Sequence, residues 1–485
     1  MLLQTRRAAI ATAIPFATWF KAYGQPSFVR SDAYSPAGIA MLAKYATGVA
    51  KMRITAETDA TSWMFQWYTH AVRPDRGIAA ELARVFPVPS PKKALAQDMW
   101  NTCQAHGFSV TPPQKEEYFL PWHRMFVYFF ERIVRKACAD PTFSLPYWNY
   151  SAPGANHGRI PPAFRAAGTL FEAKRRPWVN TGQPIDRISA INPAPNGTLN
   201  LSVLSEPSYN PGPARRGFCE TLDRGLHGNV HVEVGGPTNM GSVPWAAEDP
   251  VFWMHHCNID RLWASWNRNG GNNPVDAAFK NQKFIFADEN GNKVSMAIGD
   301  VLSISPLHYS YDRLEPAPAG FHPTAAGAAP ASAPSPTHRL VSLNATGAES
   351  KSAVKLVDNK PENYFSARIK NLPSARRMYL SLSGLSAKAQ PGVIYGVYLN
   401  LPTNGAATGR DSYRVGHLSF FDAGGHEGHA GGSSSKKQVF DITDVARYVT
   451  KGGVKIEEPV VSLIPLGAPE AGAEAVVGEI TILEQ

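Results

Sequence analysis

Residues 249–263 read DPVFWMHHCNIDRLW, and this stretch decides how the surrounding chain folds. Apolar side chains recur along it at a spacing typical of a buried helix. Two adjacent histidines, His255 and His256, interrupt the apolar run. Neighbouring helix residues point about 100° apart, so the two imidazoles cannot both face one ion. We expect one of them to bind a metal and the other to lie beside the ligands and orient its neighbours.

Another pair of histidines lies about 25 residues upstream, in LDRGLHGNVHVEVGG, residues 222–236. His227 and His231 are four residues apart, which places both imidazoles on one face of a helix. Such a pair alone is weak evidence for a metal site, because most histidine pairs with this spacing bind no metal. Its position shortly before a second histidine pair makes it a candidate metal site.

Three more histidines stand in or beside aromatic segments of the N-terminal half. They are His70 in WMFQWYTHAV, His106 in NTCQAHGF and His123 in FLPWHRMF. One buried histidine is usually hydrogen-bonded and inert, but six in such surroundings predict a metal site. Imidazole ligands without carboxylate or thiolate suit copper, zinc or iron. Hydrolytic two-zinc sites usually include Asp or Glu, so the pattern favours a copper that changes oxidation state and leaves positions open for O2.

The bulk composition is that of an ordinary globular protein. The 485 residues are too many for one compact core, which predicts two domains. The net charge is 48 − 39 = +9, but the basic residues are scattered, so nucleic-acid binding is not indicated. The four cysteines form no CxxC pair, which excludes a zinc ribbon.

The N-terminus has the pattern of an export signal. Arg6 and Arg7 precede an apolar run from Ala8 to Phe20, so residues 1–24 are typical of a twin-arginine signal, and a periplasmic or secreted protein is expected. The alternative is an ordinary N-terminal helix of a cytoplasmic protein. No later apolar run approaches the roughly 18 residues that span a bilayer, so we expect no membrane span.

The chain divides by composition into two folded parts. Residues 25–315 are rich in aromatic residues and helical periodicity, and residues 118–137 predict one strong helix. Residues 316–339 are rich in Pro and Ala and predict a linker. Residues 340–485 contain short runs of β-forming residues between turns and predict a β-sandwich, with strands near 378–385, 393–402, 460–467 and 478–485.

These histidine segments resemble those of the type-3 dicopper proteins, the tyrosinases and catechol oxidases. The resemblance spans about residues 30–315, and HYSYDRL, with Tyr309 and Tyr311, is similar to the family's Tyr-x-Tyr motif. It implies a mainly α catalytic domain with a central four-helix bundle, two copper ions and O2 as co-substrate. By this resemblance one copper is held by His70, His106 and His123, and the other by His227, His231 and His256. His255 then lies outside the ligands, beside the substrate pocket.

The chain departs from the family around the second histidine of the first copper. His106 lies 17 residues before His123, farther than in the family, which an insertion near residues 108–115 would explain. Some members carry a Cys–His thioether on this histidine with another spacing. Cys103 could form one here, and a free cysteine is the equal alternative.

The resemblance implies that small phenols are the substrates, through tyrosinase activity: ortho-hydroxylation of monophenols and oxidation of o-diphenols to o-quinones. A phenol has a pKa of about 10, so a base assists its binding. Asp223 takes the place of the family's water-holding Glu and is one methylene shorter. Gly228 stands where an Asn often follows the first histidine of the second copper. Val243 stands where plant enzymes carry a bulky Phe. The smaller Val side chain would leave room for substrate above the second copper.

Three alternatives keep the same metal pair. A catechol oxidase or an o-aminophenol oxidase would lack monophenol activity, and Gly228 favours the former. A haemocyanin-like O2 carrier would bind O2 without turning over substrate. The C-terminal part would cover the copper entrance, or would instead form contacts in a homo-oligomer.

Overall fold

Histidine-bearing helices and a separate group of strands make up the two parts of the chain. The structure is a computed structural model, and it describes residues 27–106, 115–186, 197–210, 217–319, 321, 343–345, 350–353, 364–374, 376–402, 409–423 and 436–484. We call residues 27–319 the helical part and residues 343–484 the tail. The predicted export signal and most of both the predicted linker and the predicted insertion near residues 108–115 lie outside the described residues.

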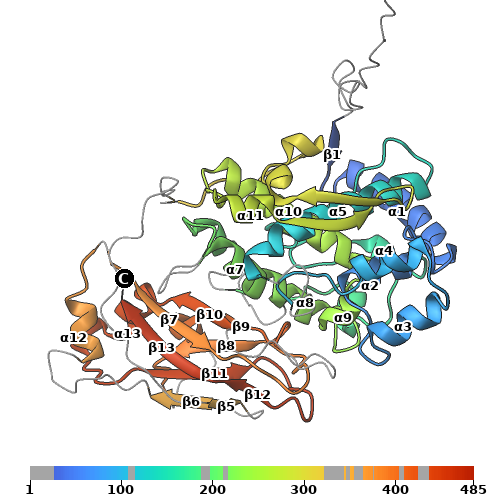
Figure 1. The fold of residues 1–485 in the computed structure, drawn as a ribbon. Coiled ribbons are helices and arrows are strands. Elements are labelled where there is room, and N and C mark those ends of the chain that lie inside the picture. The colour runs from blue at the N-terminus through green and yellow to red at the C-terminus, as the bar shows by residue number, and fades with distance from the viewer. Residues whose placement is uncertain are drawn as a thin grey trace, which may run out of the picture.

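Long helices form the centre of the helical part (Figure 1). The predicted helix at 118–137 is confirmed as α5, Phe119–Ala137. The positive charges of Arg135 and Lys136 in its last turn stabilise the negative end of the helix dipole. The opening stretch forms α10, Val251–Arg268. Helix α5 contacts both α10 and α1, Pro36–Ile54. Three shorter helices complete this layer: α2, Trp63–His70; α3, Ile78–Val85; and α4, Pro91–Met99.

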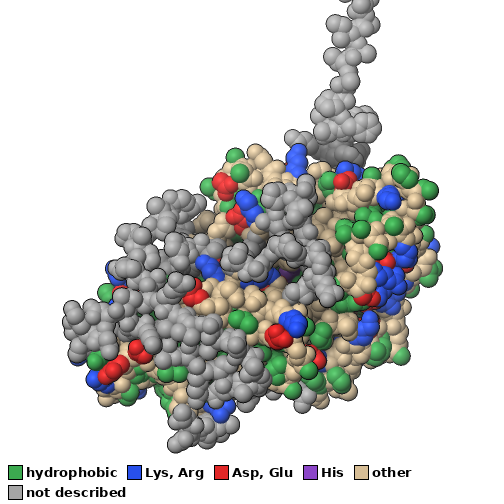
Figure 2. Space-filling view, turned by 60° about the horizontal axis from the view of Figure 1, so that its bottom comes forward, with side chains coloured by type: hydrophobic (Ala, Val, Ile, Leu, Met, Phe, Trp, Pro, Cys, Tyr) green, Lys and Arg blue, Asp and Glu red, His purple; other side chains and the backbone are tan. Residues whose placement is uncertain are grey.

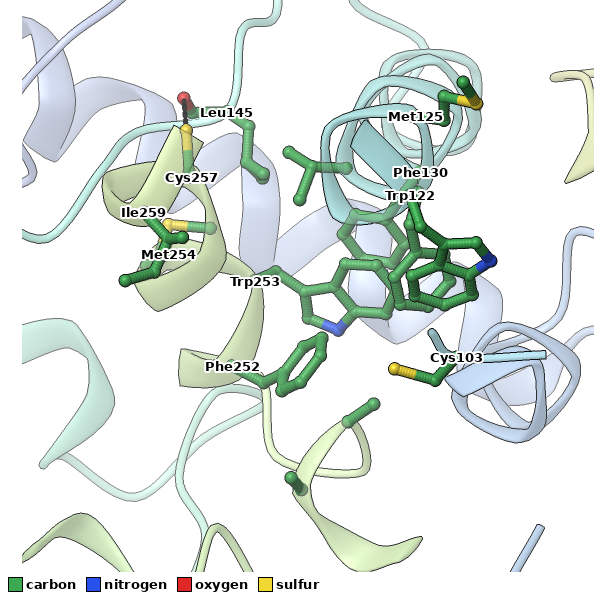
Figure 3. Close-up of a cluster of buried hydrophobic side chains, with 14 of the residues drawn as sticks. Cys103, Trp122, Met125, Phe130, Leu145, Phe252, Trp253, Met254, Cys257 and Ile259 are labelled. Carbon is green, nitrogen blue, oxygen red and sulfur yellow. Dashed lines mark hydrogen bonds between the residues drawn. The ribbon is translucent and has the colours of Figure 1, made fainter. Parts of the chain in front are cut away.

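Aromatic side chains hold α5 against α10. The rings of Phe130 and Trp253 are stacked with centroids 3.4 Å apart, and Trp122 and Phe252 lie next to them (Figure 3). Nearby, the Cys257 thiol donates to the carbonyl oxygen of Leu145 over 3.5 Å (Figure 3). Large buried aromatic surfaces of this kind dominate the energy of a core. His123 of α5 and the pair His255 and His256 of α10 are therefore held on two helices that pack firmly together.

A broken helix carries His227 and His231. It consists of α7, Phe218–Leu222; a π-helical turn, η5, Asp223–His227; and α8, Gly228–Val234. Single π-helical turns are frequent at functional sites because they re-aim side chains within a helix. The four-residue spacing predicted a plain α-helix here, and the π turn is a difference that the spacing did not indicate.

The remaining elements of the helical part are short, and they connect and cover the long helices. The helices are α6, Pro177–Asn180; η2, Glu116–Tyr118; η3, Pro162–Phe164; η4, Ser202–Ser205; α9, Val243–Ala246; α11, Ala277–Asn281; η6, Ile298–Val301; and η7, Ser305–Leu307. Strands β2, Lys283–Ala287, and β3, Lys293–Ala297, form an antiparallel hairpin. Strand β1, Phe28–Arg30, pairs in parallel with β4, Tyr309–Tyr311, so the two ends of this part meet.

The tail is built of antiparallel sheets (Figure 1). Strands were predicted near 378–385, 393–402, 460–467 and 478–485, and all four are confirmed as β7, Met378–Ser383; β8, Tyr395–Leu399; β11, Val460–Pro465; and β13, Glu479–Glu484. One sheet has the order β10-β7-β13 and another β6-β11-β8-β9. The added strands are β6, Ser350–Ala353; β9, Arg414–Leu418; and β10, Lys437–Asp441.

Alternate residues of both sheets meet in one buried apolar cluster, separate from the core of the helical part. It contains Leu380, Val397, Val461 and Ile480, one from each predicted strand. Helices α12, Phe365–Lys370, and α13, Thr443–Val449, pack beside it, and β5, Leu343–Ala345, pairs with β12, Ala475–Val477. Strand β9 contacts η5, so the tail lies against the broken helix.

Among the described residues, no helix has both the length and the apolar character that crossing a membrane requires. Figure 2 shows Lys and Arg side chains lying among Asp and Glu on the visible face.

Candidate metal centre

Seven buried histidines and one cysteine meet in the interior of the helical part. They form two clusters, in each of which the candidate donor atoms lie within 4.8 Å of one another. The first contains His70, Cys103, His106 and His123, and the second contains His227, His231, His255 and His256. The structure thus brings together all six histidines predicted as ligands, grouped as the resemblance implied.

The two clusters adjoin each other. The rings of His123 and His256 are stacked with centroids 4.3 Å apart. His106 is likewise stacked on His227, with centroids 5.9 Å apart. Two ions held in these clusters would therefore be close neighbours, as a metal pair requires.

Backbone carbonyl groups fix the orientation of four of these rings. The Nδ1–H groups of His70, His123, His227 and His231 donate to the carbonyl oxygens of Val243, Phe119, Asp223 and Met240 over 2.8–3.1 Å. This leaves each Nε2 with its lone pair toward the other rings. Ligand histidines in metal sites are commonly held in this way.

Several ring nitrogens have no hydrogen-bond partner although they are buried. They include Nε2 of His70, His227 and His231 and both nitrogens of His106, His255 and His256. Burying so many lone pairs unpaired is costly, and a bound metal ion would satisfy them. Burial, with a contribution from His227, lowers the pKa of His70 to about 3, so the ring is neutral and able to bind a metal.

His255 lies closer to the centre than the sequence indicated. Its ring centroid is 4.8 Å from that of His231 and 5.3 Å from that of His227, and its donor atom belongs to the second cluster. On its other side the ring of Tyr150 lies 5.5 Å away. The sequence favoured His256 alone as the ligand, whereas the structure gathers both.

Cys103 faces the first cluster. Its Sγ lies 3.5 Å from Nε2 of His123, whereas the sequence suggested His106 as its partner. Burial raises the pKa of this thiol well above its usual range, and the Asp223 carboxylate adds to the effect. The thiol is therefore protonated unless a metal ion or a covalent bond replaces its proton.

Asp223 is oriented by its own helix. Its Oδ1 lies 3.0 Å from Nδ1 of His227. Burial raises the pKa of the Asp223 carboxyl, and this effect outweighs the lowering by His227. The Val243 carbonyl holds His70, a residue of the first cluster, whereas the sequence led us to expect Val243 beside the second.

The tail contributes side chains that no sequence signal indicated. The ring of Phe421 is stacked on His231 with centroids 4.0 Å apart, and it lies 5.6 Å from His227 and 5.8 Å from His106. Ser419 packs against Gly228: a Cβ placed at residue 228 would lie 2.7 Å from the Ser419 Oγ. Nothing in residues 414–423 marks them as neighbours of the histidines, because the contact depends on how the two parts dock.

Comparisons with known proteins agree with this geometry. A family profile described as the common central domain of tyrosinase matches residues 92–215 and 194–269. A profile described as the polyphenol oxidase middle domain matches residues 274–320, and a domain of unknown function, DUF7868, matches residues 337–485.

Among curated proteins the chain is similar to tyrosinase HcTyr1 of Hahella sp. (strain CCB-MM4). The two are 32% identical over 295 residues, which cover 56% of this chain and 60% of that protein. This chain is also 32% identical to (+)-larreatricin hydroxylase of Larrea tridentata, over 41% of this chain and 38% of that protein. The chain therefore matches less than two thirds of the length of either relative.

Solved structures show that the fold extends to the tail. Latent apple tyrosinase superposes with a TM-score of 0.61 at 20% identity and covers 95% of this chain and 97% of its own. A functional unit of octopus hemocyanin gives a TM-score of 0.51 at 14% identity, covering 94% of this chain and 99% of its own.

Proposed function

Because residues 92–269 carry the common central domain of tyrosinase, the chain belongs to the tyrosinase family, and we propose that it is a dicopper phenol oxidase. The observation that carries the proposal is the pair of adjoining buried clusters whose imidazole nitrogens lack hydrogen-bond partners. We assign His70, His106 and His123 to one copper and His227, His231 and His256 to the other. Residues 25–315 form the proposed catalytic domain, with α2, α5, α8 and α10 as its four-helix frame and residues 340–485 as a β-sandwich.

A copper pair bound there would supply the redox chemistry, in which a catechol gives up two electrons and two protons to become an o-quinone and O2 accepts electrons. The chain's own groups prepare the reaction. The carbonyls of Val243, Phe119 and Met240 hold the imidazoles in position before substrate arrives. The aromatic core around Trp253 keeps bulk water away from the reacting atoms.

Asp223 is the proposed proton acceptor for the substrate hydroxyl. Burial raises the pKa of its carboxyl, which makes the carboxylate a stronger base than an exposed one. His255 and Tyr150 lie beside the second cluster, where a substrate ring would have to approach. We propose His255 as a positioning group for that ring.

We propose tyrosinase activity, the hydroxylation of monophenols as well as oxidation of o-diphenols. The small side chain of Val243 supports access for a phenol ring, whereas the absence of an amide side chain at Gly228 favours the catechol oxidase alternative. The Hahella relative is named a tyrosinase, which supports the first choice. An o-aminophenol oxidase would keep the same residues and prefer another ring.

The docked tail covers this centre, so we propose that the full chain is latent. The ring of Phe421 occupies the face of His231 on which a substrate ring would stack. Displacement of the tail would uncover it. On the basis of Arg6 and Arg7 we also propose that the enzyme is exported, and the tail is the proposed contact surface if the chain forms homo-oligomers.

Oxygen uptake by copper-loaded protein tests the proposal. Tyrosine and catechol would be supplied to the full chain, to chain cut within residues 322–339, and to the variant Phe421→Ala. Uptake with both substrates supports tyrosinase, and uptake with catechol alone supports catechol oxidase. Latency predicts that cleavage and Phe421→Ala each raise the rate at least about tenfold, the factor that 1.4 kcal/mol represents.

Phe420→Ala shows the effect of a general loosening of the tail, as distinct from removal of the Phe421 ring alone. Phe420 is the neighbouring ring, but it is buried in the apolar core of the tail. Its loss should destabilise the tail by about 3–5 kcal/mol, which heat unfolding will show. If neither the cut chain nor Phe421→Ala takes up oxygen with any phenol, the oxidase proposal is wrong.

A second candidate is an O2 carrier, which two observations favour. Phe421 covers the histidines, and the fold is shared with the octopus hemocyanin unit. A carrier would bind O2 reversibly and would not consume it with catechol, even after removal of the Phe421 ring.

A further inference from the structure

A cavity of about 380 Å³ lies between the helical part and the tail. One wall comes from residues 198–205 and from the outer face of α7, η5 and α8, and the other from β9, β10 and the start of α13. Its lining includes Arg224, Asn229, His417 and Gln438 but, among the described residues, none of the clustered histidines. It is therefore distinct from the metal centre, although both use the same broken helix.

Three residues that line the cavity each carry a buried side-chain oxygen without a hydrogen-bond partner. These oxygens are Oγ1 of Thr198, Oδ1 of Asn229 and Oε1 of Gln438. All three residues are less than a tenth exposed. Buried polar atoms are almost always satisfied, and a bound molecule with suitable groups would pair these three.

The amide groups are oriented, so the missing partner must be a donor. The Asn229 Nδ2 donates to the Thr198 carbonyl over 3.3 Å, and the Gln438 Nε2 donates to the His417 carbonyl over 2.9 Å. Exchanging nitrogen and oxygen in either amide would lose these bonds. Each amide oxygen therefore accepts, and an N–H or O–H donor would complete it.

The remaining lining favours hydroxyl groups on a ring. Most of the cavity wall is polar, with Ser202, Ser205 and Thr221. Its charges are of both signs, from the basic Arg224 and Lys437 and the acidic Glu220, Asp441 and Asp444. A lining of mixed charge favours a neutral polar ligand over a strongly charged one. The volume is enough for a single six-membered ring with several substituents, within the range of small-ligand sites.

We propose that this cavity is a binding site for a small ring compound with several hydroxyl donors, a monosaccharide or a diphenol. Its hydroxyl groups donate to Thr198 and Asn229 of the helical part and to Gln438 of the tail. A ligand held by both walls binds only while the tail is docked, so it stabilises the docked arrangement by mass action. The site does not rest on the oxidase proposal, because neither wall contains a proposed copper ligand.

Calorimetric titration of the full chain, loaded with zinc, tests the proposal. Zinc fills the histidine centre without redox chemistry, so nothing is turned over. D-glucose and catechol are the two probes, and they distinguish the two sources of hydroxyl groups. We expect saturable binding of one of them, with Kd below about 10 mM, and a thermal midpoint that rises with its concentration.

Variants on opposite walls assign the binding to the cavity. Thr198→Val and Gln438→Leu each remove one acceptor and should weaken binding about tenfold, the effect of one hydrogen bond of 1.4 kcal/mol. Ser462→Ala is the control, because its buried hydroxyl also lacks a partner but lies in β11 and does not line the cavity.

Three results would overturn the proposal. One is the absence of saturable binding by either probe, which would mean that water alone fills the cavity. Another is equal affinity in the wild type and both wall variants, which would place the ligand elsewhere. The third is loss of binding in Ser462→Ala to the same extent, which would indicate a general effect on the tail.

Discussion

Single hydrogen bonds decide which nitrogen of each histidine faces the centre. Since His231 donates through Nδ1 to Met240, its Nε2 is committed to the second cluster. His157 is also buried, but its Nε2 lies 2.7 Å from Asp186 and it belongs to neither cluster. The difference between a ligand and a structural histidine is therefore visible in its partners.

We predict that His231→Gln lowers the copper content from about two to about one ion per chain, because the second cluster loses a fixed donor. The oxidase rate should fall at least about a hundredfold, more than the loss of a supporting contact costs. Elemental analysis and oxygen uptake measure both. His157→Gln should keep both ions, and a similar copper loss there would contradict the assignment.

A missing side chain at residue 228 lets the tail approach the broken helix. An added Cβ would lie 2.7 Å from the Ser419 Oγ and 3.6 Å from the Phe421 Cβ, both of the tail. At Gly225, three residues earlier, a Cβ would meet no atom within 4 Å. The two glycines of one helix therefore differ in what a larger side chain would meet.

We predict that Gly228→Asn weakens docking of the tail, at a cost of about 1–3 kcal/mol typical of overpacking. The full-length enzyme should then oxidise catechol faster, because Phe421 leaves His231 more often. Gly225→Asn should leave the rate nearly unchanged. Equal rates for both variants and the wild type would show that Ser419 and Phe421 adjust without moving the tail.

At the scale of elements, one buried carboxylate joins four segments. Asp260 of α10 is ion-paired with Arg124 of α5 and, over 3.1 Å, with Arg30 of β1. The hydroxyl groups of Tyr309 and Tyr311 in β4 each donate to it over 2.5 Å. Thus the family's Tyr-x-Tyr motif closes the helical part by binding the helix that carries His256.

We predict that Asp260→Asn lowers the free energy of unfolding by about 3–5 kcal/mol at neutral pH, because the buried Arg124 loses its counter-charge and Arg30 keeps only its pair with Glu131. The measurement is urea unfolding between pH 7 and pH 3. Asp98→Asn, which breaks a half-exposed pair with Lys293, should cost about 1 kcal/mol or less.

The pH dependence of this effect has a definite sign. Burial alone would raise the pKa of Asp260, but Arg124 and Arg30 outweigh it and hold the pKa below the ordinary carboxyl value. The stabilisation is therefore present above that ordinary value and is lost as the pH falls through the folded-state pKa. The difference between wild type and Asp260→Asn should shrink in acid, and a difference that grows would contradict this account.

At the scale of the whole molecule, a few polar contacts hold the tail on the helical part. Arg176 donates to the carbonyl of Gly392 in the tail and, over 3.5 Å, to that of Val232, next to His231. Arg224 of η5 donates to the carbonyl of Lys437 in β10. Arg176 and Arg224 both make these contacts at the broken helix of α7, η5 and α8. Docking of the tail and the metal centre therefore depend on the same element.

We predict that Arg176→Met loosens the tail, since the loss of charge-assisted bonds costs about 1.5–3 kcal/mol. Hydrogen exchange in residues 414–423 should accelerate, and the latent activity should rise. Arg376→Met is the control, because among the described residues that half-exposed arginine pairs with Glu484, also of the tail, over 3.0 Å. Unchanged exchange in Arg176→Met would remove this residue from the docking interface.

The sequence by itself determined the helix at 118–137, four tail strands and the six clustered histidines. Those features depend on local periodicity and on residue chemistry, which are written along the chain. Only the tertiary structure decided that His255 joins the second cluster, that Cys103 faces His123 and that Phe421 covers His231. These contacts join residues far apart in sequence or depend on a π turn. They follow from the way buried surfaces pack together, and the spacing of residues along the chain does not encode that packing.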